Sequence, residues 1–267
     1  MSSQTGKPGK TDLRELDLPG LKELLQPTGA KPFHAKQLYQ WLWVKGCPEI
    51  DMMTDLPAGV REKLKELARV DRVGIDMLQK SKDGTIKLRF RFADDTLAEG
   101  VLIPSGKRMT ACISSQVGCA LGCHFCATGS LGFTRNLSAG EIIDQIDLLN
   151  HEAVEQYGHH LSNIVFMGMG EPLLNYDEVV KVIRVLIDPA LRGMSAQRIT
   201  LSTVGIPDMI IRMAEDIPAV QLAVSLHSAN NKKRSELIPV NKKYGISELT
   251  DALIKYQRKT ANRISIE

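Results

Sequence analysis

Three cysteines lie close together near the middle of this chain, at Cys119, Cys123 and Cys126. A fourth, Cys112, stands seven residues before them, and the remaining cysteine, Cys47, lies outside every motif and is interpreted as structural. Thiolates are ligands for soft metal ions and metal clusters, and they are also nucleophiles in redox reactions. Crowding three of them into eight residues therefore predicts a metal centre or thiol chemistry.

The spacing Cys-x3-Cys-x2-Cys argues against three common uses of clustered cysteines. A structural zinc site takes four ligands, usually from two Cys-x2-Cys pairs; no second pair exists, and His124 would be strained as a fourth ligand. Haem attachment requires Cys-x2-Cys-His, and "CALGCH" is one residue too long. A redox Cys-x2-Cys pair would not need Cys119. Three thiolates instead suit a [4Fe–4S] cluster whose fourth iron is open to a substrate or cofactor.

The elements that must position these thiols alternate between strand and helix from about residue 108. Strands are expected at "RMTACISS", "SNIVFMGMG", "RITLSTVG", "AVQLAVSLH" and "NRISIE". Ser138 with Glu141, and Asn175 with Glu178, have the spacing of capping boxes, and Ser247 is expected to cap the last helix. This alternation predicts a parallel sheet, either open or closed into a barrel.

Small and polar residues follow several of these strands, in "CISSQVGC", "MGMGE", "STVG" and "SLHS". In parallel α/β folds, ligands bind at the carboxyl ends of the strands. Glycines at these ends let the backbone approach a ligand closely. The sequence therefore predicts one shared site at that edge of the sheet, including the cysteines.

These motifs resemble those of the radical S-adenosylmethionine (SAM) superfamily, in which the open iron chelates SAM. "GMGEP", residues 168–172, strengthens the resemblance. The longer stretches "CISSQVGCALGCHFCATGSLGFTRNLSAGEI", "NIVFMGMGEPLLN", "LAVSLHSANNKKRSELIPVNKKY" and "FHAKQLYQWLW" are similar to the radical-SAM 23S ribosomal-RNA and transfer-RNA adenine-C2 methyltransferase family, and to its adenine-C8 resistance enzymes.

The resemblance implies an α/β fold with a partial (β/α)6 radical-SAM barrel. We expect a disordered tail at 1–10, a helical RNA-binding accessory domain at 11–70, a β-hairpin extension at 71–107 and the barrel at 108–267. Within the extension, "KDGT" independently signals a hairpin turn, because Asp-Gly tolerates positive φ.

The resemblance also implies cofactors and site residues. The cofactors would be a [4Fe–4S] cluster, held by the three clustered cysteines, and SAM. The SAM-contacting positions would be Gly170, Glu171, Ser202, Ser225, Leu226 and His227. The carboxylate of Glu171 would accept hydrogen bonds from the SAM ammonium group. A radical is needed because adenine C2 is electron-poor and does not attack the SAM methyl group as a nucleophile.

Two residues match the catalytic positions of the family. Cys112 would be the resolving cysteine, which attacks sulfur to release the product as a disulfide forms. It shares a strand face with Thr110 and Ser114, suited to a substrate-holding lumen. Glu99 would be the general base, on a strand face with apolar neighbours that would raise its pKa. From the residues alone, Cys112 could equally be a small core residue and Glu99 an exposed edge carboxylate.

The expected partners are 23S rRNA, with tRNA as a second candidate substrate, and an electron donor such as flavodoxin or ferredoxin. "NKKRSELIPVNKK", residues 231–243, carries five basic residues that could contact RNA phosphates. The net charge of +3 permits nucleic-acid binding without requiring it. No signal peptide or apolar run of about 18 residues is present, so the chain is expected to be a cytoplasmic monomer with no membrane partner.

The sequence departs from the family pattern at its end, because it stops at Glu267 and has no cysteine after Cys126. We expect a truncated chain that lacks the last helix and strand and the methyl-carrying cysteine, and that does not methylate RNA by the two-cysteine route. Three alternatives stay open: an adenine-C8 methyltransferase, another radical-SAM enzyme, or a non-catalytic metal- or RNA-binding module.

Overall fold

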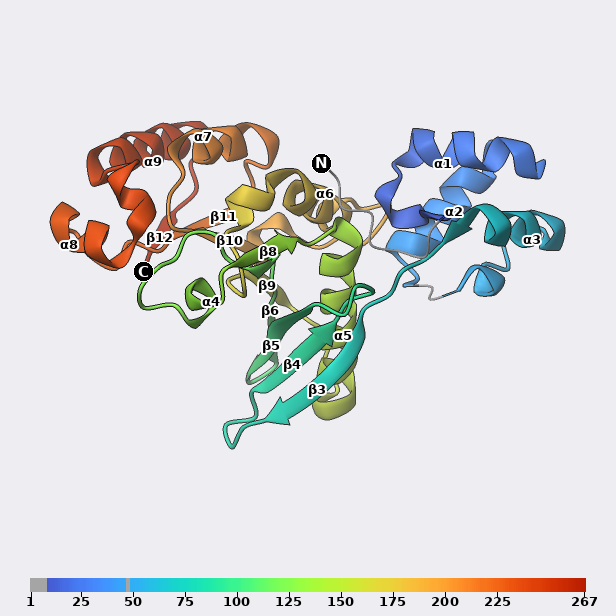
Figure 1. Cartoon of the computed structure of the whole chain (residues 1–267), viewed down its shortest axis with the longest axis horizontal. Coiled ribbons are helices and arrows are strands. Elements are labelled where there is room, and N and C mark those ends of the chain that lie inside the picture. Colours follow the sequence, from blue (N-terminus) through green and yellow to red (C-terminus); the bar gives the residue numbers. More distant parts are fainter. Residues whose placement is uncertain (1–8, 47–48) are drawn as a thin grey trace.

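A computed structural model describes residues 9–46 and 49–267. Most of the expected N-terminal tail and Cys47 lie outside the described residues. Figure 1 shows an N-terminal helical unit at one end of the molecule, the barrel at the other, and a β-hairpin extension below them. None of the described helices is long and apolar enough to cross a membrane.

An eight-stranded mixed sheet forms the centre of the fold, in the order β12-β11-β10-β9-β6-β5-β4-β3. Its strands are β3 (Gly74–Lys80), β4 (Ile86–Arg91), β5 (Leu97–Ser105), β6 (Arg108–Cys112), β9 (Asn163–Phe166), β10 (Ile199–Thr203), β11 (Gln221–Val224) and β12 (Ile264–Ile266). Strands β6 and β9 to β12 pair in parallel, while β3 to β6 pair antiparallel. All five strands of the expected parallel sheet are confirmed.

The strand register assigns the two faces of the parallel sheet. Residues of one face are fully or almost fully buried in the hydrophobic core: Ala111, Ile113, Ile164, Leu201 and Leu222. Alternating with them are half-buried residues of the other face: Thr110, Cys112, Asn163, Val165 and Thr200. The period-2 alternation therefore separates a helix-covered face from an accessible one. As expected, Thr110 and Cys112 lie on the accessible face. The same expectation is wrong for Ser114, which follows the end of β6 and is fully buried.

Helices connect the parallel strands. They are α5 (Ala139–Tyr157), α6 (Tyr176–Ile187), α7 (Pro207–Asp216), α8 (Asn231–Leu237) and α9 (Ile246–Thr260), with short 3-10 turns η4 (Pro172–Asn175), η5 (Ala196–Arg198) and η6 (Pro239–Lys242). The capping box of Ser138 and Glu141 at the start of α5 is confirmed.

Two other predicted caps are wrong. Asn175 precedes α6 but makes no cap; its amide instead donates to the Ser115 and Leu137 carbonyls, at 2.8 and 2.7 Å. Ser247 lies within the first turn of α9, which begins after Gly245. In the first case the side chain is used to hold a distant loop, which local spacing does not reveal.

The N-terminal unit is mostly helical. It consists of β1 (Thr11–Asp12), η1 (Leu13–Glu15), α1 (Leu18–Leu25), η2 (Gln26–Thr28), α2 (His34–Trp43), η3 (Ile50–Met52), α3 (Ala58–Leu67) and β2 (Ala68–Arg69). Leu21, Leu38 and Leu42 are fully buried in its core. The hairpin extension follows, and the turn between β3 and β4 contains Gly84 at φ +89°, as the Asp-Gly signal predicts.

A buried ion pair joins the N-terminal unit to α5. The guanidinium of Arg14 donates to both carboxylate oxygens of Asp144, at 2.7 and 3.0 Å. Asp144 also forms an ion pair with Arg72 and accepts a hydrogen bond from the backbone of Val73. A second, partly buried pair links Arg192, in the loop after α6, to Asp147 of α5. It is bidentate as well, and Arg192 additionally donates to a backbone carbonyl of α2.

Candidate active site

A small antiparallel ribbon carries the cysteine loop. Its strands are β7 (Gln116–Gly118) and β8 (Phe133–Asn136), and the loop between them contains the short helix α4 (Ala127–Ser130). Gly118 has φ +74°, and a Cβ there would lie 1.9 Å from the Gly132 carbonyl oxygen. Only glycine therefore allows β7 to turn directly into the loop that begins with Cys119.

The three cysteines of this loop are free thiols, with Cys123 buried and the other two half-buried. Burial, followed by the nearby charges of Cys119, Cys126 and Glu171, raises the pKa of Cys123 to about 11. The polypeptide alone thus disfavours three thiolates here, so a cation that replaces their protons would relieve the repulsion.

The donor set of this loop suits a cluster better than one ion. Among the described residues, no group of three or more His, Cys, Asp or Glu side chains is arranged to hold a single metal ion. A [4Fe–4S] cluster binds each cysteine to a different iron, so its three thiolates stand farther apart than the ligands of one ion. The donor set, three cysteines without a fourth protein ligand, therefore fits the cluster and not a zinc ion.

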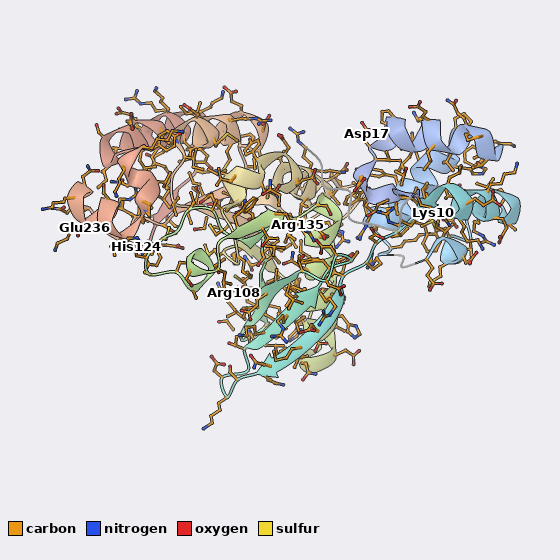
Figure 2. All side chains as sticks on the ribbon, in the orientation of Figure 1. Lys10, Asp17, Arg108, His124, Arg135 and Glu236 are labelled. Atoms are coloured by element: carbon orange, nitrogen blue, oxygen red, sulfur yellow. The ribbon has the colours of Figure 1, made fainter. Side chains whose placement is uncertain are left out.

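The cysteine loop rests against the carboxyl end of β11 and against α8. The backbone N–H of His124 donates to the Leu237 carbonyl at 3.0 Å. The ring of Phe125 lies 4.2 Å from the ring of His227. Figure 2 shows His124 beside Glu236 of α8. Residues more than 100 positions apart are thus brought to one place.

The glycine-rich turn after β9 fits tightly against the residues that lead into the cysteine loop. A Cβ on Gly168 would lie 2.6 Å from the Ser114 hydroxyl, and one on Gly170, at φ +98°, would lie 2.5 Å from Cβ of Gln116. Gln116 accepts a hydrogen bond from the Glu171 backbone at 2.9 Å. Both glycines are needed because the two loops are in direct backbone contact.

Glu171 is almost fully buried and links two loops. Its carboxylate accepts from the backbone of Leu173 at 3.1 Å and of Val204 at 3.0 Å. Burial raises its pKa to about 7, although these hydrogen bonds act in the opposite direction. The loops after β9 and β10 are therefore held together by this side chain. The hydrogen bonds that the sequence predicts Glu171 to accept from the SAM ammonium group would use its remaining lone pairs.

The other predicted SAM-contacting residues lie at the ends of β10 and β11. The hydroxyls of Ser202 and Ser225 are 3.5 Å apart. The backbone N–H groups of Leu226 and His227 both donate to the carbonyl of Glu267, at 2.9 Å each. Sequence analysis missed Glu267 and also Gln116. Glu267 directly follows β12, which is the signal that could have identified it, whereas Gln116 begins β7 and carries no such signal.

Cys112 ends β6, on the accessible sheet face. Its register neighbours are Val101 on β5 and Val165 on β9. Burial raises the pKa of its thiol to about 11. No disulfide involves Cys112 or the other described cysteines.

Glu99 lies on the same face of the sheet as Cys112, because Glu99 and Val101 are two residues apart on β5. The apolar surroundings predicted for it are not found. Its side chain is 44% exposed and forms an ion pair with Lys87 at 3.1 Å. Ile103, expected as an apolar neighbour, is itself exposed. The reason is that this face of the hairpin extension is open, while its opposite face is buried.

The basic stretch 231–243 is also not uniformly exposed. Lys232, Lys233, Lys242 and Lys243 are exposed, but Arg234 is fully buried on α8. The interpretation of all five as candidate phosphate contacts is therefore wrong for Arg234.

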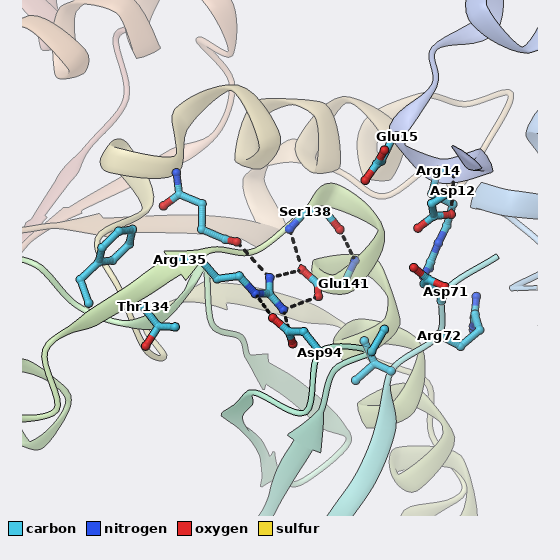
Figure 3. A pocket seen from close by; sticks show the side chains of 14 residues that line it. Asp12, Arg14, Glu15, Asp71, Arg72, Asp94, Thr134, Arg135, Ser138 and Glu141 are labelled. Atoms are coloured by element: carbon cyan, nitrogen blue, oxygen red, sulfur yellow. Dashed lines mark hydrogen bonds and ion pairs between the residues drawn. The ribbon is translucent and has the colours of Figure 1, made fainter. Parts of the chain in front are cut away.

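A cavity of about 610 Å³ lies away from the cysteines, at the junction between the N-terminal unit and the barrel. Figure 3 shows Arg135 of β8 between Asp94 and Glu141 on one side of it, and Arg14 with Asp12 on the other. Arg135 is bidentate to both acids, with distances of 2.6 to 3.0 Å. These groups hold the ribbon that carries the cysteine loop in place.

Known protein families match both the N-terminal unit and the barrel of this chain. Residues 11–70 match the family described as the ribosomal RNA large subunit methyltransferase N-terminal domain, and residues 113–265 match the radical SAM superfamily. A probable dual-specificity RNA methyltransferase RlmN from Flavobacterium johnsoniae is 45% identical, over 97% of this chain and 74% of that protein. The protein of the same name from Salinibacter ruber is 42% identical, over 97% and 72%.

A solved structure is also similar. The crystal structure of a radical SAM methyltransferase from Sphaerobacter thermophilus superposes with a TM-score of 0.86 at 39% identity, covering 96% of this chain and 75% of that one.

Proposed function

The chain belongs to the RlmN family of radical SAM RNA methyltransferases, and we propose that it supplies the cluster-binding and SAM-binding part of an enzyme that methylates carbon 2 of adenine in 23S rRNA, and also in tRNA. The methyl-carrying cysteine that the two-cysteine route requires is not among its residues. One observation carries the proposal. Three thiols from a single loop lie at the carboxyl end of a parallel sheet, where the loop contacts His227 after β11 and Leu237 of α8. Parallel α/β folds bind their ligands at this edge.

The cofactors are a [4Fe–4S] cluster and SAM, which together supply the radical that an electron-poor aromatic carbon requires. Cys119, Cys123 and Cys126 would hold the cluster. Its binding replaces the thiol protons that burial otherwise retains. The buried strands and the ribbon of β7 and β8 keep this loop in a fixed position.

SAM would be held by groups at the neighbouring strand ends. At that edge lie Gly170, which allows SAM to approach the backbone closely, and the hydroxyls of Ser202 and Ser225. The backbone of Leu226 and the ring of His227 lie there too. Glu171 would act partly by holding the loops after β9 and β10 together. These residues bind and orient the substrate; they do not need to change protonation state.

Cys112 and Glu99 would be the catalytic residues. Both lie on the accessible sheet face, where adenine would enter. The thiol of Cys112 is protonated at neutral pH, so it must lose a proton before its sulfur attacks. Glu99 is ion-paired with Lys87, and an ion pair is made by the carboxylate, the form that accepts a ring proton.

RNA would contact the exposed lysines at 232, 233, 242 and 243, which lie next to the cysteine loop. Lysine contacts to phosphate give salt-dependent affinity without sequence preference. A one-electron carrier such as flavodoxin or ferredoxin would reduce the cluster, and the chain would act as a monomer.

Anaerobic reconstitution tests the proposed function. We expect the chain to bind iron and sulfide and, once reduced, to release 5′-deoxyadenosine from SAM. C123S should lose both properties, whereas C112S should keep both, because Cys112 is not a proposed ligand. Binding of zinc without SAM cleavage would instead support a non-catalytic metal-binding module.

The position of methylation is tested in the source organism. Deletion of the gene should remove 2-methyladenosine from 23S rRNA, as measured by nucleoside mass spectrometry, and restoring the gene should return it. Loss of 8-methyladenosine instead would identify the adenine-C8 activity.

A further inference from the structure

Arg234 is a fully buried cation whose hydrogen-bond partners are all uncharged. Its guanidinium donates to the carbonyl of Leu226 at 3.2 Å and to that of Ser225 at 3.5 Å. It also donates to the Val204 carbonyl and to the side-chain oxygen of Asn241. Arg234 thus binds the loops that follow β10 and β11, where the proposed SAM-contacting residues lie.

This buried charge has no acidic partner in the protein. Across residues 9–46 and 49–267, no Asp or Glu side chain forms an ion pair with Arg234. Arg14 provides the comparison: it is almost as buried, and it is paired with Asp144 at 2.7 Å. An uncompensated charge in a protein interior is strongly unfavourable, so a buried arginine without a carboxylate indicates that a negative charge comes from elsewhere.

The cysteine loop lies next to this cation. Two contacts locate the loop there: His124 is hydrogen-bonded to Leu237 of α8, and Phe125 packs on His227, one residue after a hydrogen-bond partner of Arg234. Figure 1 shows the loop carrying α4 running beside the C-terminal elements.

We propose that Arg234 is the buried counter-charge of the three-cysteine site, a positioning residue that stabilises the reduced cluster. This inference rests on the proposed ligation of the cluster by Cys119, Cys123 and Cys126. Reduction adds one electron, supplied by the external one-electron carrier, and so adds one negative charge near Cys123. A fixed cation beside that position lowers the energy of the reduced state more than that of the oxidised state.

The test compares R234Q, which keeps hydrogen-bonding capacity without charge, with R234K, which keeps the charge. Reduction potentials are measured by spectroscopic titration of reconstituted protein without SAM. R234Q should favour the oxidised cluster at least tenfold, which lowers the potential by about 59 mV for a one-electron couple. R234K should stay near the wild-type value. K255M, which removes an exposed charge from α9, should also leave the potential unchanged.

Each possible result of this experiment supports or contradicts a specific claim. Absence of a cluster in the wild-type protein would contradict the proposed function itself. A wild-type cluster with an unchanged potential in R234Q would overturn the role of Arg234. Weaker SAM binding by R234Q at an unchanged potential would overturn it too, and would make the SAM carboxylate the counter-charge. If R234Q does not fold, judged by circular dichroism, R234K decides: loss of iron from folded R234K would overturn the proposal, because its charge is retained.

Discussion

At the scale of single residues, the site depends on positions where no side chain fits. Gly118 and Gly170 combine a positive φ with a neighbour closer than any Cβ allows. Gly118 lies against the backbone of Gly132, and Gly170 lies against Gln116, so in both places two loop segments approach too closely for a side chain. A glycine such as Gly106, also at positive φ but with open space around it, lacks this second constraint.

Substitution by alanine should separate the cost of the positive φ from the cost of the steric clash. G106A should cost about 1 kcal/mol, the penalty of the left-handed conformation alone. G170A should cost more, by about 1 to 3 kcal/mol of overpacking against Gln116, and should also weaken SAM binding. Urea unfolding of both variants measures the difference. Equal losses of stability would show that the neighbouring loop yields without strain.

At the scale of elements, Arg135 holds the ribbon of the cysteine loop between two other elements. It pairs with Asp94 in the turn between β4 and β5 and with Glu141 in the first turn of α5. Burial alone would raise the pKa of Asp94, but hydrogen bonds from Arg135 and Thr96 lower it to about 2. The carboxylate of Asp94 therefore stabilises the folded state.

The pH dependence of this contribution has a defined sign. Because the pKa of Asp94 falls from 3.8 in the unfolded chain to about 2 in the fold, the stabilisation is complete above pH 4. It is lost as the pH falls from 4 towards 2, and amounts to about 2 kcal/mol. The free energy of unfolding of wild type minus that of D94N should shrink over this range. A difference that does not change with pH would contradict the assignment.

At the scale of the whole molecule, α5 fixes the N-terminal unit against the barrel through Arg14 and Asp144. Their bidentate contact is almost fully buried, and Asp144 is also hydrogen-bonded to the backbone of Val73. This arrangement sets where the N-terminal unit stands relative to the accessible sheet face, and so how RNA held by that unit would approach Cys112.

Removing one partner of this pair should strongly lower the free energy of unfolding. R14M leaves the carboxylate of Asp144 buried beside only one arginine, and should destabilise the protein by about 3 to 5 kcal/mol. The double variant R14M/D144L should lose less, since it leaves no unpaired charge. K259M, which breaks the exposed pair with Glu215, should change little. Chemical unfolding measures all three, and a double variant no more stable than R14M would contradict the electrostatic explanation.

The sequence by itself determined the features that depend on local spacing. The cysteine motif, the glycines after β9, the five parallel strands and the capping box at Ser138 could all be identified, because each is specified within a few residues or by a regular period. The sheet edge that gathers the site follows from strand and helix alternation alone.

Only the tertiary structure decided the roles that depend on distant partners. Asn175 has the spacing of a cap but binds carbonyls about 40 and 60 positions away, Glu99 is paired with Lys87 instead of apolar neighbours, and Arg234 is buried within a stretch that appears uniformly basic. The physical reason is the same in each case: the state of a polar side chain is set by the burial and the partners that folding brings to it, and these are encoded far away in the chain.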